Sequence, residues 1–290
     1  MKTTFTNAIG SHKEEATQAK TPLLTIGLLT DAHYTDIPNR GDIAHRVALH
    51  RVSEAAETFQ QVGADFAVQL GDIIDQTPES SVEDQKCELR RIYSEFARFR
   101  GETHSVPGNH CLKVLYEAEF EQALGNPIGY RSFDKAGFHF VFLNACYRKD
   151  GTPYGRRCNE WFDADIPQHE REWLQADLQN TLGHVVIFTH QRLDAPQGDL
   201  FGVHSAEATR DIIEQSGKVI AVFQGHQHCN LLETRNGVAY ATLHAVAHDF
   251  ETNAFSLLNL YEDGAMRLIG FGRHSDHPLV VSPAANSENS

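Results

Sequence analysis

Two hydrophobic periods alternate along the first three quarters of the chain. Short apolar runs, typical of buried strands, are separated by stretches in which apolar residues recur at helical spacing. The strands expected from the apolar runs are 23–29, 66–70, 138–143, 185–189 and 219–223. The helices expected from the other stretches are 43–61, 81–99, 168–182 and 206–215, the second of them opened by a Ser81–Asp84 capping box.

The pattern changes towards the end of the chain, where strands follow one another without helices. Residues 231–235 and 238–243 flank Asn236-Gly237, a dipeptide that favours a two-residue hairpin turn. Residues 256–261 and 266–271 flank a similar Asp-Gly turn. A front of alternating strands and helices followed by a β-meander predicts a mixed, layered α/β protein.

Five of the expected strands or extended segments run directly into residues that bind metals or carry protons. In α/β sheets, binding sites form beyond the carboxyl ends of the strands. Three of these ends also carry an adjoining glycine, which lets backbone and side chains approach closely. In chain order, the residues at the five ends are Asp31 with His33, Asp72 with Asp75, Asn109 with His110, His190, and His226 with His228.

The donor set among these residues indicates more than one metal ion. Imidazole and carboxylate ligands suit Zn, Fe, Mn or Co rather than Mg alone. Asp75 and His110 are set aside for separate roles, which leaves seven donors. Seven donors exceed what one open catalytic ion needs, and they suit two ions about 3.5–4 Å apart that share a carboxylate. Taken alone, a single residue such as His190 is more often a packing or surface histidine, so the hypothesis depends on the ordered set.

The ordered motifs D-x-H, G-D-x-x-D, G-N-H, a lone His and G-H-x-H resemble the calcineurin-like metallophosphoesterase superfamily. The resemblance implies a four-layer αββα sandwich of two mixed β-sheets flanked by helices, formed as a single domain by residues 22–282. It implies one metal on Asp31, His33, Asp72 and His228. It implies a second metal on Asp72, Asn109, His190 and His226, with Asp72 bridging the two.

Three further stretches, LGDIIDQ, AVFQGHQH and FGRH, are similar to the manganese-dependent ADP-ribose/CDP-alcohol diphosphatase branch of that superfamily. Two positions depart from the pattern. His33 is present where members of the branch often lack this histidine. Cys111 stands where an acidic residue usually follows G-N-H, so His110 needs a carboxylate from elsewhere.

The resemblance implies hydrolysis of phosphodiester or diphosphate bonds in nucleotide-like small molecules. Two Mn, Fe or Zn ions are expected to lower the pKa of a bridging water, so that hydroxide attacks phosphorus in line. His110 is the expected acid for the leaving oxygen, because histidine exchanges protons near neutral pH. Asp75 is expected to orient a ligand, or alternatively to cap the turn before Pro78. A phosphomonoesterase with the same metals and a non-catalytic scaffold of the same fold remain alternatives.

Candidate substrate contacts lie beside the ligand motifs. Tyr34 follows D-x-H and is placed either to stack on a substrate ring or to pack its own loop. Arg192 is a candidate for phosphate binding. His204 is a candidate contact together with His244 and His248. The substrate preference is expected to depend on three long polar loops, 34–45, 147–167 and 191–205.

Composition narrows the partners and the compartment. Lys and Arg number 25 against 39 Asp and Glu, and the net charge of −14 with no basic run disfavours a nucleic-acid polymer as partner. No apolar run is long enough to span a membrane, and the N-terminal residues lack the apolar core of a signal peptide. Five cysteines without a C-x-x-C pair predict no disulfide framework. We therefore expect a cytoplasmic protein with a small-molecule phosphoester substrate and no membrane partner. The sequence does not indicate the oligomeric state.

The polar segments at the two ends, 1–21 and 283–290, are expected to be mobile.

Overall fold

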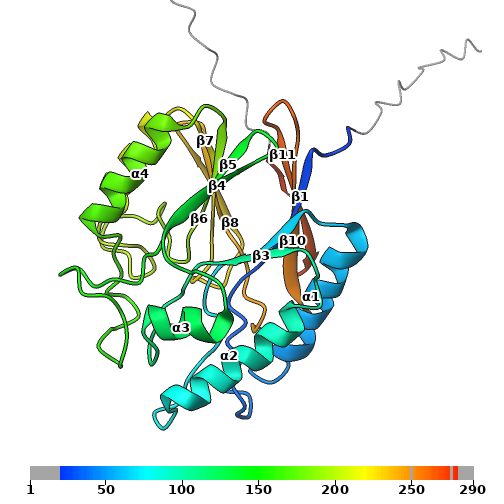
Figure 1. Cartoon of the computed structure of the whole chain (residues 1–290), viewed down its shortest axis with the longest axis vertical. Helices are drawn as coiled ribbons and strands as arrows, with labels where there is room; N and C mark the ends of the chain where they lie inside the picture. The colour runs from blue at the N-terminus through cyan, green and yellow to red at the C-terminus, as the bar shows by residue number, and fades with distance from the viewer. Residues whose placement is uncertain (1–19, 249–250, 275–276, 280–290) are drawn as a thin grey trace, which may run out of the picture.

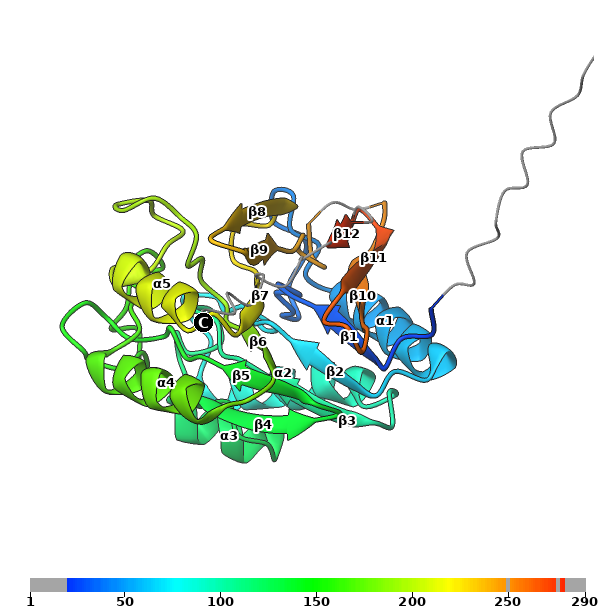
Figure 2. The ribbon, with the colours of Figure 1, turned by 90° about the horizontal axis from the view of Figure 1, so that it is seen from above.

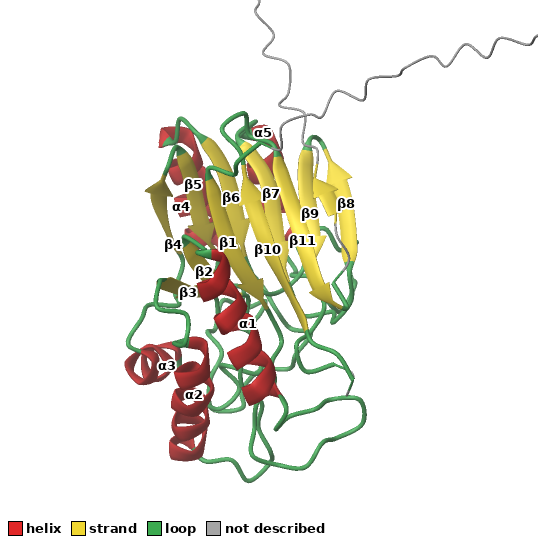
Figure 3. Ribbon diagram, turned by 90° about the vertical axis from the view of Figure 1, so that its right-hand side faces the viewer, coloured by secondary structure: helices red, strands yellow, loops and turns green. Residues whose placement is uncertain are grey.

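Two six-stranded β-sheets form the centre of the protein (Figure 1). The computed structural model describes residues 20–248, 251–274 and 277–279. Most of the expected mobile segment 1–21 and all of 283–290 lie outside the described residues. In Figure 3 the strands of both sheets run in a similar direction, and long loops gather below them.

The first sheet combines the start and the end of the described chain. Its spatial order is β12 (His277–Leu279), β11 (Met266–Gly272), β10 (Ala254–Leu260), β1 (Leu24–Leu29), β2 (Phe66–Gln69) and β3 (Glu102–Ser105). The strands β1, β2 and β3 are parallel, whereas β10 pairs with β1 in antiparallel fashion, with Leu24 opposite Leu260. This sheet is therefore mixed, as expected.

The second sheet is also mixed. Its spatial order is β4 (Arg131–Lys135), β5 (Phe138–Phe142), β6 (His184–Phe188), β7 (Val219–Gln224), β9 (Val238–Thr242) and β8 (Leu231–Arg235). The four inner strands are parallel to one another, and the two edge strands are antiparallel to their neighbours. Parallel neighbours bring the carboxyl ends of β6 and β7 to one edge.

Helices cover the outer face of each sheet. The helices α1 (Ala48–Val62), α2 (Val82–Phe96) and α3 (Glu117–Leu124) lie against the first sheet, and α4 (Gln168–Asn180) and α5 (Ala206–Gln215) against the second. Figures 1 and 2 show α1 and α4 on opposite sides of the two sheets. The order of layers is therefore helix, sheet, sheet, helix.

Three hydrophobic clusters fill the three spaces between these layers. Neighbouring residues of β1 point to opposite faces, as in any strand. Leu28 belongs to the cluster between the two sheets, together with Phe140 and Phe188, whereas Leu29 belongs to the cluster under α1 and α2. A third cluster joins the second sheet to α4 and α5. The expected four-layer αββα sandwich is confirmed, while a single domain over 22–282 stays a prediction.

Some boundaries differ from the expected ones. The first helix begins at Ala48 rather than at residue 43, because the preceding backbone bonds elsewhere: Ala44 N–H donates to Ala247 O at 2.9 Å, and Ile43 pairs with Arg40. The short elements α3, β4 and β12 have no counterpart among the expected ones. The C-terminal strands do not form one meander, because the β8–β9 hairpin joins the second sheet and the β10–β11 hairpin joins the first.

Two findings concern the cysteines and the helices. All five cysteines are free, so none of them forms a disulfide. Among the helices of the described residues, none has the length and apolar character that crossing a membrane requires.

Candidate metal centre

The chain makes sharp turns where the ligand motifs follow the strands. The N–H of Asp31 donates to Gly71 O at 3.0 Å and that of His33 to Asp72 O at 2.9 Å, which joins the ends of β1 and β2. Positive φ is uncommon for residues with side chains and gathers at functional sites. Five of the predicted ligands have a φ between 46° and 70°: Asp31, His33, Asp72, His226 and His228.

Two glycines leave room for ligand side chains, as their place in the motifs predicts. A Cβ atom on Gly108 would lie 2.2 Å from Asp72 Oδ1, and one on Gly71 would lie 2.2 Å from His190 Nδ1. Both distances are far shorter than a van der Waals contact. Glycine at these positions therefore sets where Asp72 and His190 lie.

The first group of predicted ligands consists of Asp31, His33 and His228. His228 Nε2 lies 3.2 Å from Asp31 Oδ1, and His33 Nε2 lies 3.0 Å from His228 Nε2. His33 Nε2 is also 3.5 Å from Asp31 Oδ1. One donor atom from each residue lies within 4.8 Å of the others, so the three side chains are placed to hold one ion.

The second group consists of Asp72, His190 and His226, and their donor atoms also lie within 4.8 Å of one another. His190 Nε2 is 3.1 Å from Asp72 Oδ2. Asp72 Oδ2 is also 4.0 Å from His33 Nε2, which places this carboxylate between the two groups. Asn109 lines the same pocket as Asp72 and His226.

Buried donor atoms without hydrogen-bond partners test whether metals fit here. Leaving a buried polar atom unpartnered costs about 1–3 kcal/mol, so such atoms rarely gather by chance. Five of them come from the predicted ligands: Asp31 Oδ1, His33 Nδ1, Asn109 Oδ1, His190 Nε2 and His226 Nε2. This set of oxygen and imidazole donors suits two divalent transition-metal ions.

The charges around the two groups keep the carboxylates ionised. Burial raises the pKa of Asp72, but the nearby His190 and His110 hold it well below its usual range. Burial lowers the pKa of His190, but Asp72 and Asp31 raise it to about 8. Burial and the neighbouring His190 lower the pKa of His226 to about 3. The carboxylates are therefore ionised and His226 is neutral, the forms that bind metals, whereas His190 has to release a proton when it binds an ion.

Asp75 supplies the carboxylate that the position of Cys111 lacks. Its Oδ1 lies 2.7 Å from His110 Nδ1, and the backbone N–H of His110 donates to Asp72 Oδ1 at 2.7 Å. Burial raises the pKa of Asp75, but His110 and His33 hold it far below its usual range. Asp75 Oδ1 also accepts the N–H of Gln76 at 2.7 Å, so the carboxylate serves the local turn as well.

His45 lies beneath the D-x-H motif, and no pattern in the sequence indicates this position. His45 Nδ1 donates to His33 O at 2.8 Å and faces Asp75 Oδ2 at 3.8 Å. His45 is only 2% exposed. The apolar periodicity places His45 in a helix, where no motif marks it, and only the loop before α1 brings it to the site.

The donors open into a pocket of about 310 Å³ with an aromatic side. Trp161 and Phe201 come from the loops 147–167 and 191–205, and sequence reasoning did not single them out. The sequence indicated only that the loops carrying these two residues would control substrate preference. The complete lining is His33, Asp72, Asn109, His110, Trp161, Phe201, His226 and His228.

The three expected substrate contacts do not line this pocket. Tyr34 is 1% exposed and packs in the cluster under α1 and α2. The guanidinium of Arg192 makes two bonds to Asp194, at 3.0 and 2.7 Å, and one to Gln227, which occupy it within the protein. His204 Nε2 lies 3.0 Å from Asp163 Oδ1. The three side chains are therefore held by other parts of the protein, outside the lining of the metal pocket.

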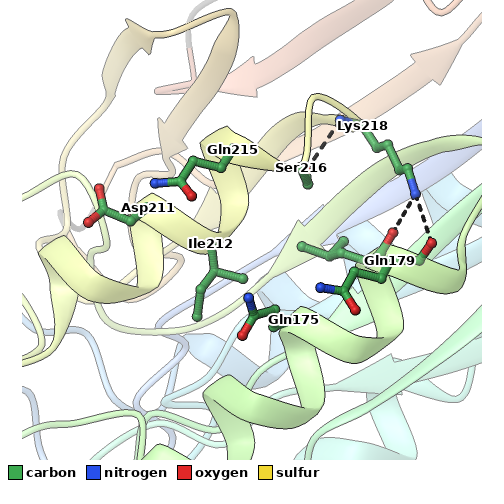
Figure 4. A pocket seen from close by; sticks show the side chains of 8 residues that line it. Gln175, Gln179, Asp211, Ile212, Gln215, Ser216 and Lys218 are labelled. Atoms are coloured by element: carbon green, nitrogen blue, oxygen red, sulfur yellow. Dashed lines mark hydrogen bonds between the residues drawn. The ribbon is translucent and has the colours of Figure 1, made fainter.

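A separate pocket of about 320 Å³ lies between α4 and α5 (Figure 4). Lys218 Nζ closes one side by donating to Leu178 O at 2.7 Å and Gln179 O at 3.2 Å. None of the predicted metal ligands lines it. The pocket between α4 and α5 is therefore separate from the candidate metal centre at the strand ends.

Carboxylates, an amide and histidines at the strand ends of a two-sheet sandwich define the class of metallophosphoesterases. A model of the family described as calcineurin-like phosphoesterase matches residues 24–230. The chain belongs to this family and is a metal-dependent hydrolase of phosphoric esters. Members of the family bind two divalent metal ions.

Relatives extend the match over nearly the whole chain. A manganese-dependent ADP-ribose/CDP-alcohol diphosphatase from Oryza sativa subsp. japonica is 23% identical over 313 aligned positions, which cover 91% of this chain and 96% of the relative. A protein of the same name from Arabidopsis thaliana is 29% identical over 116 positions, covering 38% and 36% of the two chains. The structure of a dimetal phosphatase from Danio rerio has a TM-score of 0.78 at 21% identity and covers 90% of this chain and 100% of its own, which shows a shared fold.

Proposed function

We propose that this protein hydrolyses phosphodiester or diphosphate bonds in nucleotide-like small molecules, with two divalent metal ions at the strand ends. The observation that carries the proposal is the position of Asp72, whose Oδ2 lies 3.1 Å from His190 and 4.0 Å from His33, in the other ligand group. The preference for diphosphate and diester bonds, and for manganese, is supported by the name of the rice relative.

The chain offers four side chains to each ion, with Asp72 shared. Ions bound there supply positive charge to the phosphoryl oxygens and lower the pKa of water. The first ion would be held by Asp31, His33, Asp72 and His228, and the second by Asp72, Asn109, His190 and His226.

His110 is placed to give a proton to the leaving oxygen. It lines the pocket, and its Nδ1 lies 2.7 Å from Asp75 Oδ1, which leaves Nε2 for the substrate. The ionised Asp75 accepts a hydrogen bond from Nδ1 and so fixes the orientation of the ring. Cys111 takes no part as a nucleophile, because burial raises the pKa of its thiol to about 12.

A phosphomonoesterase would use the same ligands, and two aryl substrates separate the alternatives. With Mn²⁺ present, a bis-aryl phosphate should be hydrolysed faster than the matching mono-aryl phosphate. Faster turnover of the monoester would favour the monoesterase.

A non-catalytic scaffold of the same fold is disfavoured by the buried donor atoms without partners. The absence of both activities and of bound metal would support the scaffold.

Replacement of Asp72 tests the shared carboxylate. We expect Asp72→Asn to bind less than one equivalent of Mn²⁺ where the wild type binds two, and to lose on the order of 10³ or more in kcat, because both ions lose a charged ligand. Metal content is measured by elemental analysis after desalting, and turnover with the bis-aryl phosphate. Asp150→Asn makes the same chemical change at an exposed residue and should retain both properties. Wild-type metal content and rate in Asp72→Asn would show that the carboxylate does not bridge.

A further inference from the structure

Trp161 and Phe201 form an aromatic wall at one side of the metal pocket. Their ring centroids lie 5.4 Å apart. The ring centroid of His226 lies 5.8 Å from that of Trp161 and 5.6 Å from that of Phe201. All other residues lining this pocket are polar donors of the metal centre or its acid. The wall is therefore one ring away from a predicted ligand and supplies the apolar part of the pocket.

The loop that carries Trp161 is held by hydrogen bonds between its own segments. The hydroxyl of Tyr154, a residue 1% exposed, donates to Asp163 O at 2.7 Å. Asp163 Oδ1 accepts the N–H of Lys149 at 3.1 Å, and Asp165 N–H donates to Tyr147 O at 2.8 Å. These bonds fix the backbone two and four residues after Trp161.

Phe201 is fixed relative to the metal ligands through Arg192. The N–H of Arg192 donates to Phe201 O at 3.1 Å, and Val203 N–H donates to Arg192 O at 3.3 Å. Arg192 follows the predicted ligand His190 by two positions, and its own side chain is held by Asp194. The residue expected to bind phosphate therefore positions the aromatic ring.

The two loops are also bonded to each other. His204 N–H donates to Ala164 O at 2.9 Å, and Ser205 N–H donates to Asp165 Oδ1 at 2.8 Å. The His204 side chain bonds to Asp163 at 3.0 Å. Because both loops are joined at these points, Trp161 and Phe201 form one preformed surface.

Within the described residues, part of the apolar surface at the entrance of the metal pocket is exposed. Trp161 is 37% exposed, and the adjoining Phe162 is 41% exposed. Exposed apolar surface rimmed by polar residues is typical of a ligand-binding site. The two rings are tilted by 46° to each other, Trp161 is exposed and Phe201 is half-buried, which fits a flat partner better than a flexible alkyl chain that needs enclosure.

We propose that the aromatic wall binds the nucleobase of the substrate while its phosphoryl group lies at the metal centre. This inference rests on the proposed function and names the part of the substrate that the site recognises. Stacking accepts any base, because every base has a π-face. The wall therefore selects nucleoside phosphoryl compounds over base-free ones, with little preference between purines and pyrimidines.

Intrinsic fluorescence tests base binding without turnover. The protein has two tryptophans, and Trp173 packs against Tyr130 at 4.9 Å and does not line the metal pocket. In Trp173→Phe with Mn²⁺ bound, we expect AMP to change the emission of Trp161, and ribose 5-phosphate and inorganic phosphate to leave it unaltered. Trp161→Phe, which keeps Trp173, is the control and should not respond. Equal responses to AMP and ribose 5-phosphate, or none to AMP, would overturn the proposal.

Kinetics separate this inference from the proposed function. The substrates are ADP-ribose and a base-free analogue, the methyl ester of ribose 5-diphosphate. We expect the ratio of their kcat/KM values to fall on the order of 10- to 100-fold in Trp161→Ala and Phe201→Ala, mainly through KM for ADP-ribose, as expected for loss of one stacking partner. Trp161→Phe should restore most of the ratio.

Leu200→Ala is the matched control, because Leu200 adjoins Phe201 but does not line the pocket. Its substrate ratio should stay at the wild-type value. An unchanged ratio in both wall variants would overturn the inference and leave the phosphoesterase intact. A wild type that hydrolyses neither substrate would overturn the proposed function, and the fluorescence result would then decide on base binding by itself.

Discussion

At the scale of single residues, Asp75 connects the two kinds of chemistry in this site. Its carboxylate lies 2.7 Å from the Nδ1 of His110, the proposed acid, and 3.6 Å from that of His33, a predicted metal ligand. His45 approaches the same carboxylate at 3.8 Å. One ionised group therefore orients a proton donor and a metal ligand together, so a change at Asp75 would affect both.

A change at His110 should affect only proton transfer. We expect His110→Gln to reduce kcat about 10²- to 10⁴-fold, the usual contribution of a general acid, while both metal ions stay bound. The loss should be large for an alkyl leaving group, which needs a proton, and small for p-nitrophenolate, which leaves without one. Steady-state rates with both leaving groups and metal analysis test this. Equal losses with the two leaving groups would contradict the acid role.

The residues that sequence reasoning found and those it missed differ in what fixes their position. The seven predicted ligands lie within a few residues of strand ends, so the packing of the two sheets brings residues such as Asp31, after β1, and His226, after β7, together: the N–H of His226 donates to Asp31 Oδ2 at 3.0 Å. His45, Trp161 and Phe201 lie on loops whose paths depend on hydrogen bonds between segments distant in sequence. No periodicity or spacing marks such residues.

At the scale of elements, the strand-to-loop turns carry the site. Four of the five turns combine a residue of positive φ or a glycine with a ligand, and side chains from different strands meet within hydrogen-bond distance, as Asp72 and His190 do. The nine predicted strands begin and end within one or two residues of the observed ones, whereas no apolar run indicated β4 or β12. The start of α1 was not, because bonds to Ala247 and His33 hold residues 44 and 45 outside the helix. The split of the final hairpins between two sheets also depends on pairing that no local pattern records.

A methyl group at Gly108 tests how closely these turns fit. Its Cβ would lie 2.2 Å from Asp72 Oδ1 and 2.4 Å from Asp72 N, so the backbone cannot yield easily. We expect Gly108→Ala to lower Mn²⁺ affinity and kcat by at least roughly 10-fold through displacement of Asp72. Titration with Mn²⁺ followed by activity measures both.

The matched control is a glycine of a turn with space around it. A Cβ atom on Gly137, in the turn between β4 and β5, would meet no other part of the protein within 4 Å, although the φ of 81° adds strain for alanine. Gly137→Ala should lower the unfolding temperature without reducing Mn²⁺ affinity. Equal Mn²⁺ affinities of Gly108→Ala and the wild type would contradict the close fit.

At the scale of the whole molecule, three apolar layers hold the sandwich, and polar contacts fix the outer helices on it. His139 of β5 provides one such contact. Its Nδ1 lies 2.7 Å from Asp134 Oδ1 in the edge strand β4, and its Nε2 lies 2.8 Å from Asp177 Oδ2 in α4. Ser132 Oγ donates to the other oxygen of Asp177 at 3.0 Å. One imidazole thus joins a central strand, an edge strand and a helix.

The two carboxylates make this contact dependent on pH. Burial lowers the pKa of His139, but hydrogen bonds and charge from Asp177 and Asp134 raise it above the ordinary value of 6.5. The folded protein therefore holds a proton that the unfolded chain releases near pH 6.5. The stabilisation is complete below that pH and is lost as pH rises through the higher pKa of the folded state. Water screens Asp134, whose side chain is 83% exposed, so the contribution is about 0.5–1 kcal/mol.

Replacement of His139 with glutamine should therefore destabilise the protein more in acid than in base. We expect the free energy of unfolding of His139→Gln to lie about 0.5–1 kcal/mol below that of the wild type near pH 5.5, and the difference to shrink near pH 8.5. Urea unfolding of both proteins at equal Mn²⁺ concentration measures it, since pH effects on the metal ligands are common to both and cancel in the difference. Asp134→Asn removes one of the two partners and should show a smaller effect of the same sign. A difference that is constant across this range, or that grows with pH, would mean that His139 stays neutral and joins the layers only as a hydrogen-bonding group.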